Sequence, residues 1–316
     1  MKQFALVFPG QGSQSVGMLD AWGDHPAVAD TLKEASDALS QDLGLLIREG
    51  PKEALALTTN TQPVMLVAGV AAWRVWQSAG GAQPALLAGH SLGEYSALVA
   101  AGALTLTQAA PLVRFRAEAM QEAVPVGTGA MAAILGMDAE RVRAGCAEVQ
   151  ATFPAGSGEV VEAVNFNDPA QTVIAGSKAA VEKACEALKA AGAKRALPLP
   201  VSAPFHSSLM RPAAERLKEK LAATAFAVPQ IPVLNNIDVA VESDPDRIRD
   251  ALYRQAFGPV RWVESVRAMK AHGVACVVEC GPGKVLAGMV KRIEPELASA
   301  ALYDAATLPE VQALLA

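Results

Sequence analysis

Residues 84–104 read PALLAGHSLGEYSALVAAGAL, and this stretch decides the fold prediction. The apolar run 85–88 predicts a buried strand, Gly89-His90-Ser91-Leu92-Gly93 follows at once, and the alanine-rich segment after it predicts a buried helix. A strand, a G-x-S-x-G turn and a helix in this order form the context of a nucleophile elbow, which exposes a serine hydroxyl at the carboxyl end of the strand. The alternative is an ordinary glycine-rich turn whose serine caps the helix.

The composition favours an α/β protein with a large core. Of the 316 residues, 52% are hydrophobic and only 5% aromatic, which fits close-packed, alanine-rich helices better than a β-sandwich. The net charge of −5 and the lack of a Lys/Arg run argue against a nucleic-acid partner. Four dispersed cysteines without a C-x-x-C pattern indicate reduced thiols and no zinc site. With no signal peptide and no membrane-length apolar run, we expect a cytoplasmic protein.

Strands and helices alternate in residues 1–125 and 200–316, which indicates one large domain around a parallel sheet. Its first strand, 3–8, ends in a glycine-rich loop at 9–14, whose backbone N–H groups could donate to an oxyanion. The other elements expected here are helices at 25–41, 51–57, 61–79, 107–121, 211–223, 246–257, 264–272 and 309–315, and strands at 231–235 and 274–278.

Residues 126–199 follow a different order and predict a small domain inserted in the large one. The pattern predicts a strand, a helix, two strands joined by Asn167-Asp168-Pro169, a helix and a last strand. This β-α-β-β-α-β order is typical of a ferredoxin-like α+β unit. The alternative is that these elements continue the main sheet. The bounds expected are 130–135, 138–150, 160–166, 171–175, 177–190 and 195–199.

His206 is the best candidate for the base that a nucleophilic serine needs. It lies in the stretch 200–208, which two prolines hold extended. Of the other histidines, His25 and His272 are expected in solvent or at helix ends. His90 lies inside the elbow, and we expect its ring to point away from the serine hydroxyl.

No acid for a catalytic triad stands out. Asp138 and Asp168 lie between the serine and the histidine in chain order, but their contexts predict a helix cap and a turn. A dyad with the histidine oriented by a backbone carbonyl is at least as well supported, so both possibilities stay open. Arg116 is expected on a helix beside the elbow, where an arginine can bind a substrate carboxylate through two hydrogen bonds. The pattern alone favours a solvated or salt-bridged arginine there.

Five motifs along the chain carry a resemblance to a known family. They are FPGQGSQ at 8–14, GHSLGEYSAL at 89–98, RAEAMQEAVP at 116–125, SAPFHS at 202–207 and GPGKVL at 281–286. In these motifs, and in their order, the sequence resembles the malonyl-CoA:acyl carrier protein transacylases. It also resembles the acyltransferase domains of polyketide and animal fatty-acid synthases. The family fold that this implies is a hydrolase-like α/β domain with a ferredoxin-like insertion.

The resemblance implies a role for each matched position. Ser91 would carry the acyl group as an ester, and His206 would be the general base and then the acid. The backbone N–H groups of Gln11 and Leu92 would form the oxyanion hole. Arg116 would bind the free carboxylate of malonate.

Two further residues are assigned by the same resemblance. The backbone carbonyl of Gln255 would orient the histidine, although the residues that flank Gln255 differ from the family pattern. Phe205 matches malonyl-selective members, whereas members with other acyl preferences often have serine there.

The implied reaction moves a malonyl group from malonyl-CoA to the phosphopantetheine thiol of acyl carrier protein, in the service of fatty-acid synthesis. The resemblance implies malonyl-CoA as substrate, acyl carrier protein as partner, no bound cofactor and no metal, and we expect a monomer. The open alternatives are a serine hydrolase, a non-catalytic binding module, and a role in malonate decarboxylation or polyketide synthesis. The carrier is acidic, so its docking candidates are the basic residues Lys189, Lys194, Arg195, Lys284, Lys291 and Arg292.

Overall fold

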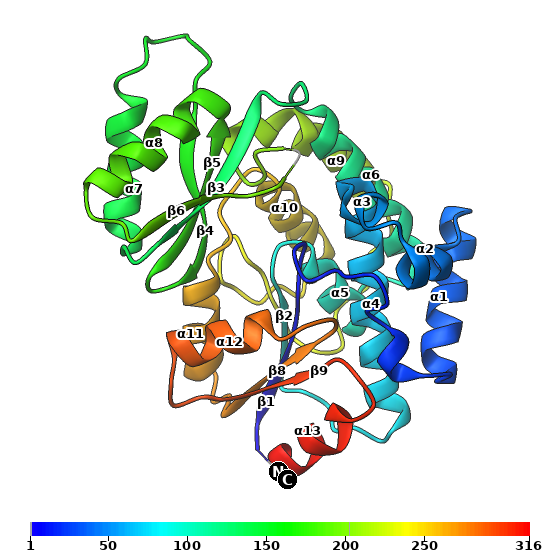
Figure 1. The fold of residues 1–316 in the computed structure, drawn as a ribbon. Coiled ribbons are helices and arrows are strands. Elements are labelled where there is room, and N and C mark those ends of the chain that lie inside the picture. The colour runs from blue at the N-terminus through cyan, green and yellow to red at the C-terminus, as the bar shows by residue number, and fades with distance from the viewer. Residues whose placement is uncertain (1, 202) are drawn as a thin grey trace.

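The computed structural model describes residues 2–201 and 203–316, so Ser202 of the SAPFHS motif lies outside the described residues. Figure 1 shows two sheets in two separate parts of the molecule. One has five strands in the order β7-β2-β1-β8-β9, and every pairing in it is parallel. The other has four strands in the order β4-β5-β3-β6, all antiparallel. The predicted α/β class, with a parallel sheet and a separate antiparallel sheet, is confirmed.

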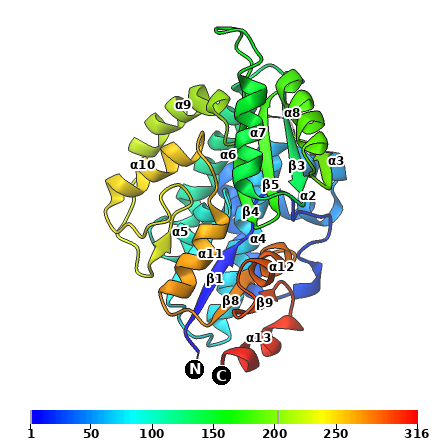
Figure 2. The same cartoon turned by 90° about the vertical axis from the view of Figure 1, so that its left-hand side faces the viewer.

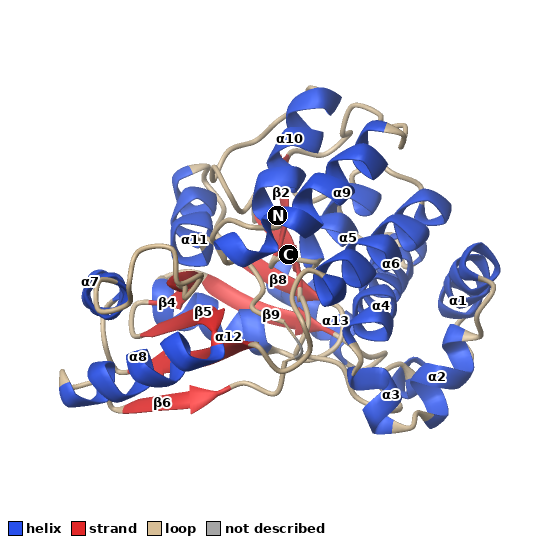
Figure 3. Cartoon of the chain, turned by 90° about the horizontal axis from the view of Figure 1, so that it is seen from above, coloured by secondary structure: helices blue, strands red, loops and turns tan. Residues whose placement is uncertain are grey.

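Both faces of the parallel sheet are covered by helices, which explains why its strands are apolar throughout. Side chains of β1 alternate between two clusters: Phe4, Leu6 and Phe8 pack against α4, whereas Ala5 and Val7 pack against α11 and α12. Figure 3 shows α4 and α6 on one side of β8 and β9, and α11 on the other. The strands are β1 (Phe4–Phe8), β2 (Leu86–Gly89), β7 (Val233–Leu234), β8 (Cys276–Cys280) and β9 (Ala298–Leu302).

The helices of this part of the chain begin mostly at the expected places. They are α1 (Pro26–Leu39), α2 (Leu43–Glu49), α3 (Lys52–Ala56), α4 (Thr58–Ser78), α5 (Gly93–Ala100), α6 (Leu106–Glu122), α9 (Arg211–Ala222), α10 (Pro245–Gln255), α11 (Trp262–Ala271), α12 (Val285–Ile293) and α13 (Thr307–Leu315), with short 3-10 turns at Asp20–Trp22 and Ser208–Met210. Among the residues that the structure describes, none of these helices combines the length and the apolar character that crossing a bilayer requires.

The antiparallel sheet is built from β3 (Gly129–Leu135), β4 (Val161–Asp168), β5 (Gln171–Ser177) and β6 (Arg195–Pro198). Helices α7 (Ala139–Gln150) and α8 (Lys178–Ala190) cover one face, where Ala132 and Ile134 pack against Val142 and Val181; Figure 2 shows these two helices beside the sheet. The other face packs into the large core through Met131 and its neighbours. These elements lie within residues 126–199, and we keep the division into two domains as a proposal.

Strand β4 also bonds to the large part of the chain, through an isolated bridge to Val260 outside both sheets. Phe166 donates its backbone N–H to the carbonyl of Val260 (2.9 Å), and Val260 donates to the carbonyl of Val164 (2.8 Å). Arg292 on α12 adds an ion pair with the buried Asp168 (2.7 Å). The end of β4 is therefore held against the large part of the chain, and its asparagines reach the neighbourhood of the elbow.

Three elements were not predicted. Two of them are helices that follow short loops, α2 and α12. The third is strand β9, an alanine-rich segment without β-branched residues. Neither its hydrophobic periodicity nor its residue propensities distinguish it from a helix. Strand β8 runs two residues further than expected, because Glu279 pairs in register with Ala301 and accepts the N–H of Ala287 at the start of α12 (2.9 Å).

Candidate active site

The turn after β2 has the geometry of an elbow. Ser91 has φ of 52°, in the left-handed region, and β2 and α5 flank it directly. A Cβ on Gly93 would lie 2.1 Å from the carbonyl oxygen of Phe8, and one on Gly89 would lie 1.9 Å from the backbone of Gly93. Only glycine fits at these two positions, so the G-x-S-x-G spacing is a steric requirement of the fold.

The side chain of Asn236 binds the backbone of the elbow on both sides of His90. Its Oδ1 accepts the backbone N–H of Ser91 (2.6 Å), and its Nδ2 donates to the carbonyl of Gly89 (2.6 Å). Nothing in the sequence singled out Asn236, because it is more than a hundred residues from the motif. Its position after β7, beside β2 in the sheet, brings the two segments together.

His206 lies within hydrogen-bond distance of the serine. Its Nε2 is 2.7 Å from Ser91 Oγ, and its Nδ1 is 2.9 Å from the backbone carbonyl oxygen of Gln255. A carbonyl only accepts, so Nδ1 carries a proton and Nε2 is the lone pair that faces the hydroxyl. Burial, and after it the positive charge of Arg116, lower the pKa of His206 to about 3. The resting imidazole is therefore neutral, as a general base must be.

The loop that carries His206 is folded tightly. His206 has φ of 66°, and Ser207 donates its hydroxyl to the carbonyl of Pro204 (2.7 Å). The two acids considered for a triad have other partners: Asp138 caps α7 by accepting the N–H of Arg141 (2.9 Å), and Asp168 pairs with Arg292. The geometry is that of a Ser-His dyad with a carbonyl as the orienting group.

Arg116 is only 2% exposed, which overturns the solvated position that the pattern alone favoured. Its guanidinium donates to Gln62 Oε1 (2.6 Å), Gln255 Oε1 (3.1 Å) and Ser91 Oγ (3.2 Å). All three acceptors are neutral, and none of the ion pairs among the described residues includes Arg116. Burial lowers the pKa of Arg116, and a buried cation without a direct anion is a strong binding group for a carboxylate.

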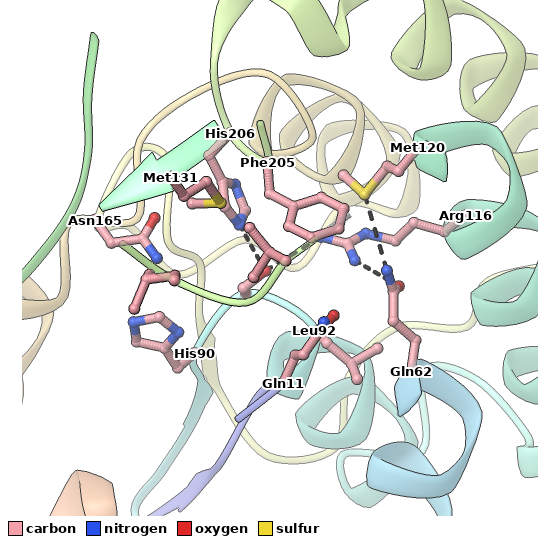
Figure 4. A pocket seen from close by; sticks show the side chains of 13 residues that line it. Gln11, Gln62, His90, Leu92, Arg116, Met120, Met131, Asn165, Phe205 and His206 are labelled. Atoms are coloured by element: carbon pink, nitrogen blue, oxygen red, sulfur yellow. Dashed lines mark hydrogen bonds between the residues drawn. The ribbon is translucent and has the colours of Figure 1, made fainter. Parts of the chain in front are cut away.

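One pocket contains these groups. Figure 4 shows Arg116 and His206 entering it from opposite sides, with Phe205 between them. Phe205 is 8% exposed and limits the space around the serine. The lining consists of Gln11, Gln62, His90, Ser91, Leu92, Arg116, Met120, Met131, Asn165, Leu199, Val201, Phe205 and His206.

Gln11 and Leu92, the two residues expected to form an oxyanion hole, both line this pocket. Within residues 2–201 and 203–316, neither backbone N–H donates to a protein acceptor. Two unused N–H donors beside a nucleophile can stabilise a developing negative charge. The side chain of Gln11 makes its own hydrogen bond to Thr58 Oγ1 (3.3 Å).

His90 points away from the serine hydroxyl, as expected. Its Nε2 is 2.8 Å from Asn167 Oδ1 at the end of β4, and burial lowers its pKa. Gln62, on α4, was missed by sequence reasoning; its place on a long apolar helix was the only available signal. Among the described residues, no group of three or more His, Cys, Asp or Glu side chains could hold a metal ion.

The fold and the pocket define an acyl transferase. The family model described as "Acyl transferase domain" matches residues 5–311, so the chain belongs to this family. Within it the chain belongs with the malonyl CoA-acyl carrier protein transacylases, as the five motifs predicted. The protein of that name from Salmonella typhimurium is 54% identical over 309 residues, covering 98% of both chains. The one from Haemophilus influenzae is 51% identical over 317 residues, covering all of both chains.

Solved structures agree with this assignment. An acyl-carrier-protein S-malonyltransferase from Burkholderia pseudomallei has a TM-score of 0.95 and 64% identity, covering 98% of this chain and 99% of its own. A second structure is a malonyl-transacylase in complex with a type II PKS acyl-carrier protein. It has a TM-score of 0.94 and 52% identity, covering 97% of this chain and 98% of its own.

Proposed function

We propose that this chain transfers a malonyl group from malonyl-CoA to the phosphopantetheine thiol of acyl carrier protein, through an ester on Ser91. The observation that carries the proposal is the position of Ser91 Oγ, 2.7 Å from the base and 3.2 Å from a buried arginine. A nucleophile, a base and a carboxylate-binding cation thus converge on one oxygen. The names of the relatives supply the acyl group and its acceptor.

In the first step Ser91 Oγ attacks the thioester carbonyl while Nε2 of His206 takes the hydroxyl proton. The imidazolium that forms is stabilised by its Nδ1–H bond to the carbonyl of Gln255 (2.9 Å). The tetrahedral intermediate then expels the CoA sulfur, which leaves with the proton from His206. The serine ester and free CoA are the products of this half-reaction.

The oxyanion of this intermediate is assigned to the backbone N–H groups of Gln11 and Leu92. They need no rearrangement to donate, because neither has a competing acceptor among the described residues. By comparison with mutated oxyanion holes, each donor lowers the barrier by about 3–4 kcal/mol. The N–H of Leu92 also lies at the start of α5, where the helix dipole favours negative charge.

Arg116 is assigned to the free carboxylate of the malonyl group. In the resting site its guanidinium hydrogen bonds to three neutral oxygens, and a carboxylate would replace the weaker of these contacts with charge-assisted ones. An acetyl group offers no such partner, so the site distinguishes the two acyl groups by a charge. Phe205 is assigned to the shape of the acyl pocket.

In the second step the carrier thiol replaces CoA. His206 takes the thiol proton, the thiolate attacks the ester carbonyl, and the proton returns to Ser91 Oγ as the serine leaves. We propose fatty-acid synthesis as the pathway and the cytoplasm as the site of action, with the chain acting as a monomer and without a bound cofactor. Of the six basic residues considered for carrier docking, Arg292 is paired with Asp168.

Intact-protein mass spectrometry tests the proposal. Incubation with malonyl-CoA should add one malonyl group to the native chain and none to Ser91→Ala, and addition of phosphopantetheinylated carrier should move that group to the carrier. A chain that is never acylated would leave only a binding role. Release of free malonate faster than transfer to the carrier would indicate a hydrolase instead.

A further inference from the structure

A buried carboxylate lies directly behind the elbow, outside the pocket. Glu94, in the second position of α5, is 2% exposed. Its Oε2 accepts two hydrogen bonds, from the backbone N–H of Asn236 (2.9 Å) and from Nε2 of Gln255 (2.9 Å). The reaction described above uses neither Glu94 nor the side chains of its two donors.

Gln255 connects this carboxylate with all three groups of the site. Its backbone oxygen accepts from His206 Nδ1 (2.9 Å), and its Oε1 accepts from Arg116 (3.1 Å). Its Nε2 donates to the backbone oxygen of Ser91 (3.0 Å) as well as to Glu94. A shift of this one residue would therefore displace the nucleophile, the base and the arginine together.

The carboxylate decides which way the Gln255 amide faces. A carboxylate oxygen only accepts hydrogen bonds and a guanidinium only donates them. In the observed orientation the amide nitrogen faces Glu94 and the amide oxygen faces Arg116. The reversed amide would place oxygen against oxygen and N–H against N–H, so Glu94 and Arg116 together exclude it.

Glu94 also fixes Asn236, which holds the elbow. The Asn236 backbone N–H is bound to Glu94, while its side chain bonds to the backbone of Ser91 and Gly89 (2.6 Å each). Both strained turns of the site, at Ser91 and at His206, are thus connected to the same carboxylate through one intermediate residue.

We propose that Glu94 is a positioning residue that, through Gln255 and Asn236, fixes the nucleophile, the base and the arginine relative to one another. It also supplies a negative charge that stabilises the Arg116 cation, with the Gln255 amide between the two groups. The inference rests on the proposed function, because it assigns Glu94 to the machinery of that reaction.

The charge on Glu94 depends on pH near neutrality. Burial raises the pKa of Glu94 to about 7, against the opposing effects of its hydrogen bonds and of Arg116 on α6. The other charged group that acts on it is Asp238, after β7, which also raises its pKa. Tyr95, the next residue on α5, is neutral, and the Glu94 charge raises its pKa further. Above this pH the ionised Glu94 carboxylate repels a substrate carboxylate bound at Arg116. In both protonation states, Glu94 keeps an oxygen that accepts the hydrogen bonds of Asn236 and Gln255.

The test compares two substitutions. Glu94→Gln keeps an acceptor oxygen and removes the charge, and Glu94→Met removes both at similar size. The matched controls are Glu279→Gln and Glu279→Met. Glu279 is also fully buried, with its pKa raised to about 7, and it accepts the N–H of Ala287 away from the pocket. We would measure kcat and KM with malonyl-CoA and with acetyl-CoA, from about pH 6 to about pH 8.5.

We expect kcat of Glu94→Gln within about threefold of wild type and kcat of Glu94→Met lower by about a hundredfold with both substrates. In wild type and in the Glu279 controls, we expect KM for malonyl-CoA to increase as the pH is raised beyond about 7. In Glu94→Gln we expect no such increase. KM for acetyl-CoA should not show this increase in any of the proteins. A folded Glu94→Met enzyme with wild-type kcat would overturn the proposal. If Glu94→Met does not fold, Gln255→Met replaces it, because it keeps the backbone carbonyl that binds His206 and removes the amide between Glu94 and Arg116. A folded Gln255→Met enzyme with wild-type kcat would then overturn the proposal.

The proposed function and the positioning role of Glu94 can be tested separately. Absence of malonyl transfer by the wild-type chain would remove the proposed function itself. Normal transfer by wild type, together with Glu94 variants that behave like the Glu279 controls, would leave the function intact and remove only the positioning role.

Discussion

Replacing Arg116 with alanine should abolish the preference for an acyl group that carries a carboxylate. The guanidinium is 2% exposed and 3.2 Å from the nucleophilic oxygen, so a malonyl carboxylate bound there would be a desolvated ion pair. Removing one partner of such a pair costs about 3–5 kcal/mol. At one factor of ten per 1.4 kcal/mol, kcat/KM for malonyl-CoA should fall by about 10² to 10⁴.

Acetyl transfer should respond differently to the same change. An acetyl group makes no contact with the cation that depends on charge, and alanine removes a donor that binds the attacking oxygen in the resting site. We expect kcat/KM for acetyl-CoA to change by less than about tenfold, so that the ratio of the two substrates approaches one.

The assay is the steady-state rate with each CoA ester and a saturating carrier thiol, supported by thermal unfolding of each variant. Arg114→Ala is the matched control: Arg114 lies on the same helix, and its guanidinium bonds to Gln41 instead of the pocket. It should leave the ratio unchanged. A folded Arg116→Ala enzyme with the wild-type malonyl/acetyl ratio would refute the assignment, and an equal loss with both substrates would indicate a structural role.

Two further predictions concern the pocket wall and the protein's stability. Phe205→Ser should enlarge the acyl pocket and raise kcat/KM for methylmalonyl-CoA relative to malonyl-CoA by about tenfold or more, as one methyl group is worth about 1–3 kcal/mol of discrimination; competition between the two esters measures this, and an unchanged ratio would contradict it. Glu279→Gln should make the free energy of unfolding depend less on pH. Burial raises the pKa of Glu279 from 4.5 to about 7, so the folded state binds a proton more tightly than the unfolded chain and wild-type stability falls, by about 3 kcal/mol, as pH rises across that interval. Denaturant unfolding at several pH values checks it, and parallel curves for the two proteins would count against it.

The local parts of the fold and site were predictable because short sequence segments determine them. The elbow needs glycine at two fixed distances from Ser91 for steric reasons, and those glycines stand in the motif. The ferredoxin-like order of helices and strands could be predicted because strand-like and helix-like hydrophobic patterns alternate and a turn sequence separates the two central strands. Strand β9 could not, because its alanine-rich sequence has no feature that excludes a helix.

The supporting residues could not be predicted for a different reason. Asn236 and Gln62 reach the site only because sheet order and helix packing bring distant segments together. The sequence carries one signal for Glu94: it is the only charged residue in a largely apolar, buried helix. A charge in such a place must have partners, and asking which ones would have led to Gln255.

The left-handed backbone at Ser91 and His206 has a consequence for engineering. Non-glycine residues in that region cost about 1–2 kcal/mol each, and here the cost falls on the two side chains that react. Glycine at either position would remove the strain but also the reacting side chain. Substitutions that raise thermal stability therefore have to be made elsewhere, on the surface helices and loops.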